Sequence, residues 1–287
     1  MAPDVMPIVV DNASSDRTVQ QVRKHPNVML IANPQNRGFA AAVNQGVKAT
    51  DADFILLLNP DVQLLTSIEI LTATTLKHGL AAGCLLDDAL RPQTGFSVRR
   101  FPTATTLVFE TLGFNRLFPA NAVNRRYRCL DQDLGRPGEA EQPAGAFLML
   151  RRDVWQSLGG FDERFFPVWF EDVDFCRRAY DLGLRAQYLP SVQARHAGGH
   201  SVSQIEAGCR AVYWCVSLLK YAAKHFGSIG YRTVCGSVLL TSFPRLAGEM
   251  IREKTLNPIA AYWKIIRFAG RCLISSGRTR ALGSSIS

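Results

Sequence analysis

Four short polar segments of the chain carry side chains that could bind a nucleotide, hold a metal ion or accept a proton. The first is the run Asp-Asn-Ala-Ser-Ser-Asp at residues 11–16, which directly follows the apolar residues 8–10. In open α/β sheets, ligands bind beyond the carboxyl ends of the strands. A carboxylate and hydroxyl groups at this point predict a nucleoside pocket around Asp11.

The second segment is Asn59-Pro60-Asp61, which ends the continuous apolar run at residues 54–58. Cleavage of a nucleotide diphosphate leaves negative charge that Mg²⁺ or Mn²⁺ can neutralise. One carboxylate together with oxygens of the substrate could hold such an ion, which makes Asp61 a candidate ligand. The alternative is a turn that only ends a strand, and the tripeptide by itself leaves both open.

The third segment, at residues 169–176, places three carboxylates at the start of a predicted helix, interleaved with aromatic residues. A helix N-terminus stabilises anions, so Asp172 is expected to stay ionised and could serve as a general base toward a sugar hydroxyl. The neighbouring aromatic rings could stack on a sugar. The alternative is an ordinary acidic cluster that caps the helix.

The fourth segment is Ala-Arg-His-Ala-Gly-Gly-His at residues 194–200, which follows the last predicted strand. A histidine at a strand end, before glycines, can reach a metal ion or a diphosphate oxygen. His196 is the stronger candidate and His200 the weaker one. The alternative is that both histidines are structural.

These segments need a sheet to bring them together, and the pattern of the chain predicts one. Short apolar runs alternate with helical patterns, which is typical of βαβ units and a parallel sheet. Residues 91–141, with their arginines, prolines and glycines, predict a long and partly mobile segment. We expect strands at residues 8–10, 28–32, 54–58, 143–150 and 186–189, and helices at residues 38–48, 67–78, 153–158 and 172–182.

Length and cysteine usage bound the class of protein. A chain of 287 residues forms one large or two small domains. Its seven cysteines are scattered and include no C-x-x-C pair, so neither a disulfide framework nor a zinc site is indicated. Residues 1–7 do not read as a secretory signal, and we expect a reducing, cytoplasmic location.

The net charge of +9 belongs to the tail of the chain. Residues 205–287 contain 12 basic and 3 acidic residues, whereas residues 1–204 contain 21 of each. A neutral front part argues against a nucleic-acid-binding surface, while a basic tail with apolar runs at 210–226 and 234–243 favours attachment to an anionic membrane surface on the inner leaflet. Neither run reaches the ~20 apolar residues of a spanning helix. The alternative is a solvated basic tail.

Taken in order, the motifs VVDNASSD, NRGFAAAVNQG, LLLNPDV, GGFDERFF, FEDVDFC and HAGGHS resemble the family 2 glycosyltransferases, specifically their rhamnosyltransferase-like branch. The resemblance covers residues 8–226. It implies an α/β GT-A nucleotide-diphospho-sugar transferase domain with a mainly parallel sheet over residues 1–204, and a separate helical tail over residues 205–287. The implied reaction is an inverting transfer of rhamnose or another hexose from a nucleotide-diphosphate donor, with dTDP-rhamnose favoured, to a saccharide or lipid-linked acceptor in cell-surface polysaccharide synthesis.

The resemblance also implies roles for individual residues. Asp172 is the expected base with Glu171 beside it, and Asp61 and His196 are the expected ligands of Mg²⁺ or Mn²⁺. The residue Asn59 stands where the family has the first acidic residue of its metal-binding triplet. The residues expected to contact the nucleotide sugar are Asp11, Asn12, Ser14, Asn36, Arg37, Gly38, Asn44 and Asn59.

Family members open with a strand and a helix before VVDNASSD, whereas seven residues precede Ile8 here. We therefore expect the first βα unit to be missing and its two neighbouring strands to lack a partner. One explanation is a start site assigned too late or a shortened gene. The other is a catalytically inactive relative that acts as a binding partner. A nucleotidyltransferase is a further alternative, although the Gly-rich basic phosphate loop typical of that class is not seen.

Overall fold

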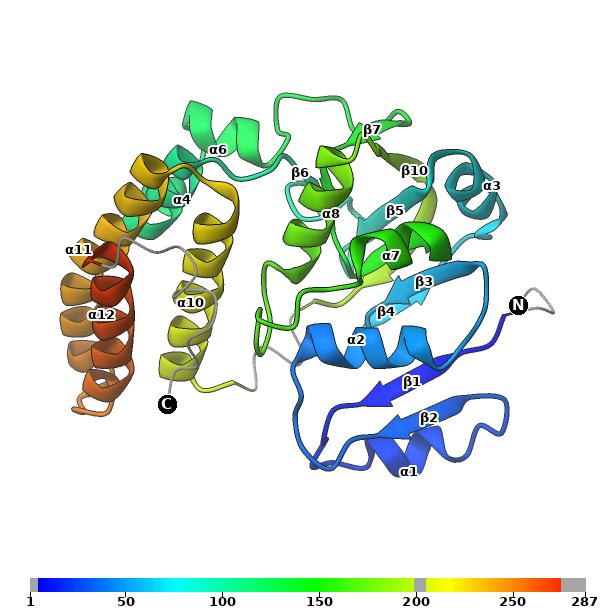
Figure 1. Cartoon of the computed structure of the whole chain (residues 1–287), viewed down its shortest axis with the longest axis horizontal. Coiled ribbons are helices and arrows are strands. Elements are labelled where there is room, and N and C mark those ends of the chain that lie inside the picture. The colour runs from blue at the N-terminus through cyan, green and yellow to red at the C-terminus, as the bar shows by residue number, and fades with distance from the viewer. Residues whose placement is uncertain (1–4, 199–204, 275–287) are drawn as a thin grey trace.

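The first part of the chain alternates strands and helices, as the sequence predicts. The computed structural model describes residues 5–198 and 205–274, so His200 lies outside the described residues. The elements in this part are β1 (Ile8–Asp11), α1 (Thr18–Val22), β2 (Met29–Ala32), α2 (Phe39–Lys48), β3 (Phe54–Leu58), β4 (Val62–Leu64), α3 (Glu69–His78) and β5 (Leu80–Leu86). The arrowheads of β1, β2 and β3 point toward the same side of the molecule, where the tail helices stand (Figure 1).

The second part of the chain completes the sheet. It contains β8 (Gln142–Pro143), β9 (Phe147–Arg151), α7 (Arg152–Leu158), α8 (Glu171–Asp181) and β10 (Ala186–His196). The six-stranded sheet has the order β3-β9-β5-β10-β4, with β7 (Gly138–Ala140) paired to β10. In the described residues, β10 with β5, and β1 with β2 in a separate sheet, pair in parallel, while β9, β4 and β7 pair antiparallel to their neighbours, so the sheet is mixed. The reason is that β9 enters at the carboxyl end of β3, where the Asn59 N–H donates to the Ala146 carbonyl at 3.1 Å, and so runs antiparallel to both of its neighbours.

Helices cover both faces of the six-stranded sheet. Along β9, Leu148 and Leu150 enter one apolar cluster with α2, α7 and α8. Phe147 and Met149 enter a second cluster, which contains Leu71 of α3. This alternation is the period of two that a strand buried on both faces must show, and it places the carboxyl ends of β3 and β10 between the two layers of helices.

In the described residues, β1 pairs only with β2, and β3 pairs only with β9. The sheet is therefore divided between β1 and β3 in the described residues. The helix α2 keeps the two parts together, because Gly46 packs directly on Val10 of β1 while Ala40 and Val47 join the main core.

Residues 91–141 are more regular than we expected. They form β6 (Val98–Arg99), α4 (Ala104–Leu112), α5 (Phe114–Leu117), α6 (Ala122–Tyr127) and β7 (Gly138–Ala140). The polar and proline residues mark helix starts instead of a continuous loop. The side chain of Thr103 accepts a hydrogen bond from the Thr106 N–H at 3.1 Å, and that of Asn121 accepts one from the Asn124 N–H at 2.8 Å, so both act as N-caps.

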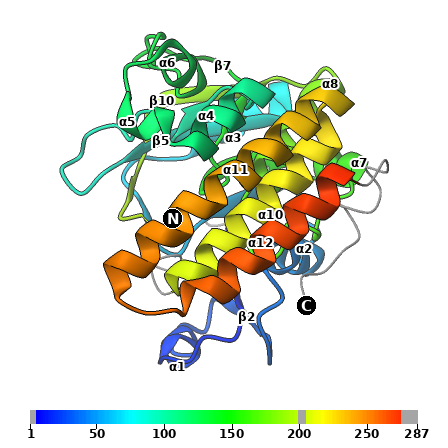
Figure 2. The same cartoon turned by 90° about the vertical axis from the view of Figure 1, so that its left-hand side faces the viewer.

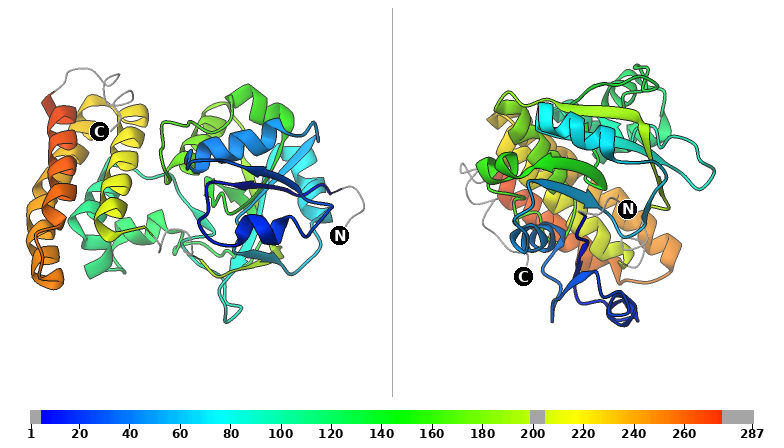
Figure 3. Two further views of the ribbon diagram at one scale, coloured as in Figure 1. Left: turned by 90° about the horizontal axis from the view of Figure 1, so that it is seen from below. Right: turned by 90° about the vertical axis from the view of Figure 1, so that its right-hand side faces the viewer.

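In its described part, residues 205–274, the tail forms the helices α10 (Ala207–His225), α11 (Ser228–Glu253) and α12 (Pro258–Ile274). They stand together at one end of the molecule, beside α4 (Figures 2 and 3). Apolar side chains of α10, among them Leu218 and Leu219, belong to the same core cluster as α8 and β9. Within the described residues, no helix is both long and apolar enough to cross a membrane. A domain division at residues 204 and 205 stays a prediction.

A buried ionic cluster fixes α10 to α8. Asp174 is fully buried and accepts hydrogen bonds from Arg178 at 2.8 Å, Lys224 at 2.9 Å and His225 at 2.7 Å. Burial raises the pKa of Asp174, but the hydrogen bond from His225 and the charges of Arg178 and Lys224 outweigh burial, so the pKa is lowered. The carboxylate is therefore ionised at neutral pH and binds Arg178 of its own helix together with Lys224 and His225 of α10.

Replacement of Asp174 by Asn is expected to destabilise the protein by about 3–5 kcal/mol, because it removes the buried negative charge that Arg178 and Lys224 both bind. The measurement is the free energy of unfolding in urea. Asp181→Asn on the same helix is the matched control, because Asp181 forms an exposed pair with Arg177, and we expect a loss of about 0–1 kcal/mol there. Equal losses for the two variants would contradict the structural role of the cluster.

Candidate active site

Two loops at the carboxyl ends of β1 and β2 are joined through Asn12. Its amide nitrogen donates to the side chain of Asn36 at 2.9 Å and to the carbonyl of Gly38 at 3.1 Å, and its amide oxygen accepts from the Arg37 N–H at 2.9 Å. Beside it, Asp11 is buried. The structure thus brings four of the predicted nucleotide-contacting residues into one hydrogen-bonded unit.

The two carboxylate oxygens of Asp11 differ in their hydrogen bonding. Its Oδ2 accepts from the Ser14 N–H at 3.2 Å, whereas its Oδ1 is buried and has no hydrogen-bond partner among the described residues. Buried acceptors are rarely left unpaired. An N–H or O–H group of a nucleoside would satisfy Oδ1, which fits the pocket predicted at this strand end.

Gly38 brings the loop between β2 and α2 into contact with the segment that precedes α8. Its φ is +84°, and a Cβ at this position would lie 2.8 Å from the ring of Phe166 and 3.2 Å from the carbonyl of Pro167. The next residue, Phe39, donates its N–H to the same carbonyl at 2.7 Å. Only glycine fits this approach, so Gly38 connects the predicted nucleotide pocket to the predicted catalytic segment.

The structure gives Asn44 another role than contact with the nucleotide sugar. Its amide nitrogen donates to the carbonyl of Phe161 and to the carboxylate of Glu163, both at 2.9 Å, and its oxygen accepts from the Phe161 N–H at 2.9 Å. Both ends of a buried amide are therefore occupied. We interpret Asn44 as the residue that fixes the turn at Phe161–Glu163, ahead of α8. Its place in the NRGFAAAVNQG motif could not distinguish this structural role from contact with the nucleotide sugar.

Asp61 and His196 face each other across the β4–β10 pair. The distance from Asp61 Oδ1 to His196 Nε2 is 3.6 Å, and the Ala197 N–H donates to the Asp61 carbonyl at 3.1 Å. His196 is the last residue of β10 and not part of a loop beyond the strand, because a bulge between Leu189 and Gln193 lets the strand continue. This correction places the imidazole on a rigid element.

Gln93 and Phe96 hold the imidazole of His196, and sequence reasoning missed both. The Oε1 of Gln93 lies 2.9 Å from His196 Nδ1, and its Nε2 donates to the His196 carbonyl at 2.8 Å. The ring of Phe96 stacks on the imidazole with 5.1 Å between centroids. When Gln93 accepts from Nδ1–H, the other ring nitrogen, Nε2, carries no proton, and its lone pair is on the side of Asp61. No signal in the sequence pairs residues this far apart.

The residues present fit a divalent cation. Metal–ligand bonds of about 2.0–2.2 Å allow two ligand atoms on one ion to lie about 3–4 Å apart, as Asp61 Oδ1 and His196 Nε2 do. Burial lowers the pKa of His196, while the charge of Asp61 opposes this shift, so the imidazole is held neutral, as a ligand requires. The described residues contain no cluster of three or more potential His, Cys, Asp or Glu ligands, so the substrate's own oxygens would have to complete the shell.

A single turn connects this pair to Asp172. The Asn59 N–H donates to the Ala146 carbonyl at 3.1 Å, and the preceding residue, Gly145, donates its N–H to Asp172 Oδ2 at 3.0 Å. The other carboxylate oxygen of Asp172 accepts from the Val173 N–H at 2.8 Å. Two backbone donors therefore fix the carboxylate of Asp172, and Asn59 acts through its backbone at the same turn.

Glu171 and Asp172 are adjacent in sequence but differ in environment. Asp172 is half-buried, whereas Glu171 is buried and its Oε2 has no hydrogen-bond partner in the described chain. Burial raises the pKa of Glu171 well above its ordinary value, and the charge of Asp172 raises it further. Burial thus favours the protonated form of Glu171, and Asp172 is the less buried carboxylate of the two.

The residues before α8 are held in a strained conformation by the tail. Trp169 and Phe170 have φ angles of +78° and +72°, which cost energy in residues other than glycine. Helix α10 supports them, because Ser217 donates to the carbonyl of Val168 at 3.1 Å and the ring of Tyr221 lies 5.3 Å from that of Phe170. The tail therefore contributes to the geometry of Asp172.

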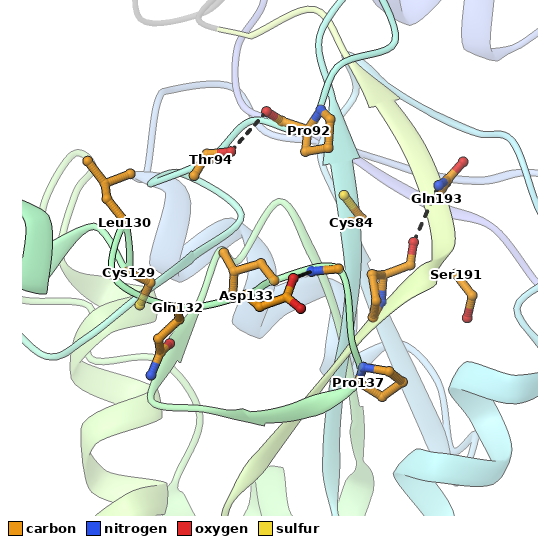
Figure 4. Close-up of a pocket in the computed structure, with 13 residues that line it drawn as sticks. Cys84, Pro92, Thr94, Cys129, Leu130, Gln132, Asp133, Pro137, Ser191 and Gln193 are labelled. Atoms are coloured by element: carbon orange, nitrogen blue, oxygen red, sulfur yellow. Dashed lines mark hydrogen bonds between the residues drawn. The ribbon is translucent and has the colours of Figure 1, made fainter.

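A separate cavity of about 620 Å³ lies behind the turn that carries Gln93. Figure 4 shows Cys84 of β5 and Gln193 of β10 on one side, with Asp133 and its neighbours from the loop after α6 on the other. None of the predicted site residues lines it. The candidate active site is therefore the open region at the strand ends and not this cavity.

Comparisons with known proteins identify the family and the fold of the chain. Residues 3–101 match the family model described as glycosyl transferase family 2. The crystal structure of GalNAc-T7 with UDP, GalNAc and Mn²⁺ superposes with a TM-score of 0.51 over 76% of this chain and 44% of that protein, at 12% identity. This likeness shows the fold, an α/β fold of the GT-A type.

Two curated relatives extend the match beyond the family model. The N-acetylglucosaminyl-diphospho-decaprenol L-rhamnosyltransferase of Mycobacterium tuberculosis (strain CDC 1551 / Oshkosh) is 30% identical over 240 residues, which cover 77% of this chain and 75% of that protein. Rhamnosyltransferase WbbL of Escherichia coli (strain K12) is 27% identical over 172 residues, which cover 58% and 60%. These matches leave no support for a nucleotidyltransferase. The chain belongs to glycosyltransferase family 2, in its rhamnosyltransferase-like branch.

Proposed function

We propose that this glycosyltransferase moves rhamnose from dTDP-rhamnose, with inversion, to a saccharide on a lipid-linked acceptor in cell-surface polysaccharide synthesis. The names of its relatives from M. tuberculosis and E. coli support the sugar, and that of the former supports the acceptor class. The observation that carries the proposal is the turn at residues 145–146, which ties Asp172 to the strand end that leads to Asp61 and His196.

In this reading, the donor lies across the ends of the strands. Its nucleoside contacts Asp11 Oδ1 and the loops that Asn12 joins, and its diphosphate lies at Asp61 and His196. Asp172 removes the proton of the acceptor hydroxyl as the oxygen attacks the anomeric carbon, and the nucleoside diphosphate departs from the opposite face. A single displacement of this kind inverts the anomeric centre and needs no covalent intermediate.

Asp61 and His196 would hold Mg²⁺ or Mn²⁺ at the diphosphate. When bound, such an ion supplies positive charge for the leaving group. The chain's own contribution is to fix the two ligands: Gln93 sets the tautomer of His196, and the β4–β10 pairing sets the position of Asp61. Cytoplasmic attachment to an anionic membrane surface through the basic tail completes the proposal, because it would bring the enzyme to a lipid-linked acceptor.

Asp172→Asn is expected to lower kcat by about 10²–10⁴-fold, the usual contribution of a general base, without loss of folding. The assay is release of nucleoside diphosphate from a panel of donors, with dTDP-rhamnose expected to be the best. Asp181→Asn, at the exposed end of the same helix, is the matched control and should keep full turnover. Turnover of Asp172→Asn within threefold of the wild type would contradict the assignment, and wild-type protein that binds donors without turning them over would indicate an inactive binding partner.

Gln93→Leu is expected to raise the Mn²⁺ concentration for half-maximal turnover by about 10–100-fold, because the Nδ1 of His196 loses the acceptor that orients it. Turnover should fall to background in a chelator and return with added Mg²⁺ or Mn²⁺. The control is Gln63→Ala on β4, which removes an exposed hydrogen bond to Arg195 next to the site. An unchanged metal dependence in Gln93→Leu would show that His196 does not bind the ion.

A further inference from the structure

The helix α11 exposes four large apolar side chains on one side. Ile229, Leu240, Phe243 and Ile251 are 85%, 67%, 61% and 77% exposed. Their spacing places them on one side of a helix of 3.6 residues per turn, and the helix packs on α4 and α12. Such a row of exposed apolar side chains is unusual for a helix at a protein surface, where the exposed side is ordinarily polar.

Helix α12 continues this surface and adds basic residues. Ile259 and Trp263 are 42% and 58% exposed. They are followed on the outer side of the helix by the exposed residues Lys264, Arg267 and Arg271. Helices α11 and α12 pack side by side, and the ring hydroxyl of Tyr262 donates to Glu249 at 3.1 Å.

A third contribution comes from α5, in the segment that sequence analysis treated as irregular. Phe114, Leu117 and Phe118 are 40%, 69% and 62% exposed. The helix follows directly on the end of α4, where Arg245 of α11 donates to the Thr111 carbonyl at 2.7 Å. Figure 2 shows α5, α4, α11 and α12 on the side of the molecule that faces the viewer.

We infer that α5, α11 and α12 form one docking face for an anionic lipid bilayer, in which their exposed apolar side chains enter the headgroup region and the surrounding basic residues bind lipid phosphates. This inference rests on the proposed function, in which the acceptor is lipid-linked. It names the surface by which the protein would meet that membrane. It also adds α5, which lies outside the basic tail.

The charges on this face favour lipid over a second copy of the chain. Residues 111–130 contain four arginines and no acidic residue. On the two tail helices, one oxygen of Glu249 accepts from Tyr262 and the other is buried, while Glu253 pairs with Arg252. A two-fold symmetric interface would bring the same basic patch together on both subunits, whereas anionic headgroups complement it.

The docking face is linked to the candidate active site through α6. Arg100 donates to the Arg126 carbonyl at 2.8 Å, and the guanidinium of Arg99 lies over the rings of Phe96 and Tyr127. Phe96 in turn stacks on His196. The segment that would lie on the bilayer is thus continuous with the one that supports the proposed metal ligand, so an acceptor held in the bilayer would meet the enzyme next to its site.

The test is co-sedimentation with vesicles of phosphatidylglycerol and phosphatidylcholine, compared with vesicles of phosphatidylcholine alone. The full chain is expected to bind the anionic vesicles at low salt. The double variant Leu117→Gln, Phe118→Gln and the single variant Phe243→Gln are each expected to lower the partition coefficient about tenfold, because less apolar surface enters the bilayer. Arg267→Gln should lower it about fivefold on anionic vesicles only.

The matched control is the double variant Ile70→Gln, Leu76→Gln on α3, where the side chains are 59% and 62% exposed and lie away from the docking face (Figure 1). It should bind as the wild type does, and all variants should melt at the same temperature. Turnover with a water-soluble acceptor tests the proposed function separately from membrane docking, because the docking variants should retain this turnover. Unchanged vesicle binding in the variants, equal binding to neutral vesicles, or a wild-type dimer that these variants dissociate without any vesicle binding would each overturn the inference.

Discussion

The candidate site depends on the close approach of one glycine to one carboxylate. A Cβ on Gly145 would lie 2.9 Å from the Cβ of Asp172, and the Gly145 N–H bonds to that carboxylate. The adjacent carbonyl of Ala146 receives the N–H of Asn59, at the end of the strand that leads to Asp61. One turn between β8 and β9 therefore sets the distance between the proposed base and the proposed metal ligands. Neither α8 nor β3 alone could fix that distance, because Asp172 lies on α8 whereas Asp61 follows the end of β3.

The tail is part of this arrangement. Asp174, two residues after the proposed base, is held by Lys224 and His225 of α10, and Tyr221 of the same helix packs on Phe170. The strained backbone before α8 is thus stabilised from the tail side. A helix that contributes to the core in this way also fixes the position of the docking face relative to the proposed base, because α11 and α12 pack directly on it.

Sequence reasoning located the parts of the site that coincide with the ends of strands and helices. The roles of Asp11, Asp61 and Asp172 stay predictions, but their positions are readable from the local sequence pattern, since each follows an apolar run or opens a helix. Sequence reasoning could not find Gln93 or Phe96, since their contact with His196 spans about a hundred residues of chain and leaves no local pattern. It also ended the last strand too early, because Pro190 signals a break that the bulge in β10 accommodates. The helices of residues 91–141 were missed since short capped helices have too few turns to show a periodic face.

The division of the sheet has a consequence for how firmly the nucleoside pocket is built. β1 and β2 form a two-stranded sheet of their own, which is attached to the rest of the protein through α2 and the hydrogen bond from the Phe39 N–H to the Pro167 carbonyl, and not through the ladder of the main sheet. A pair of strands with so few cross-links opens at lower free energy than the core does, in a cooperative unit of its own. The half of the site proposed to bind the nucleoside would then open more readily than the half built on the six-stranded sheet, and a donor bound at Asp11 would stabilise β1 and β2 by mass action.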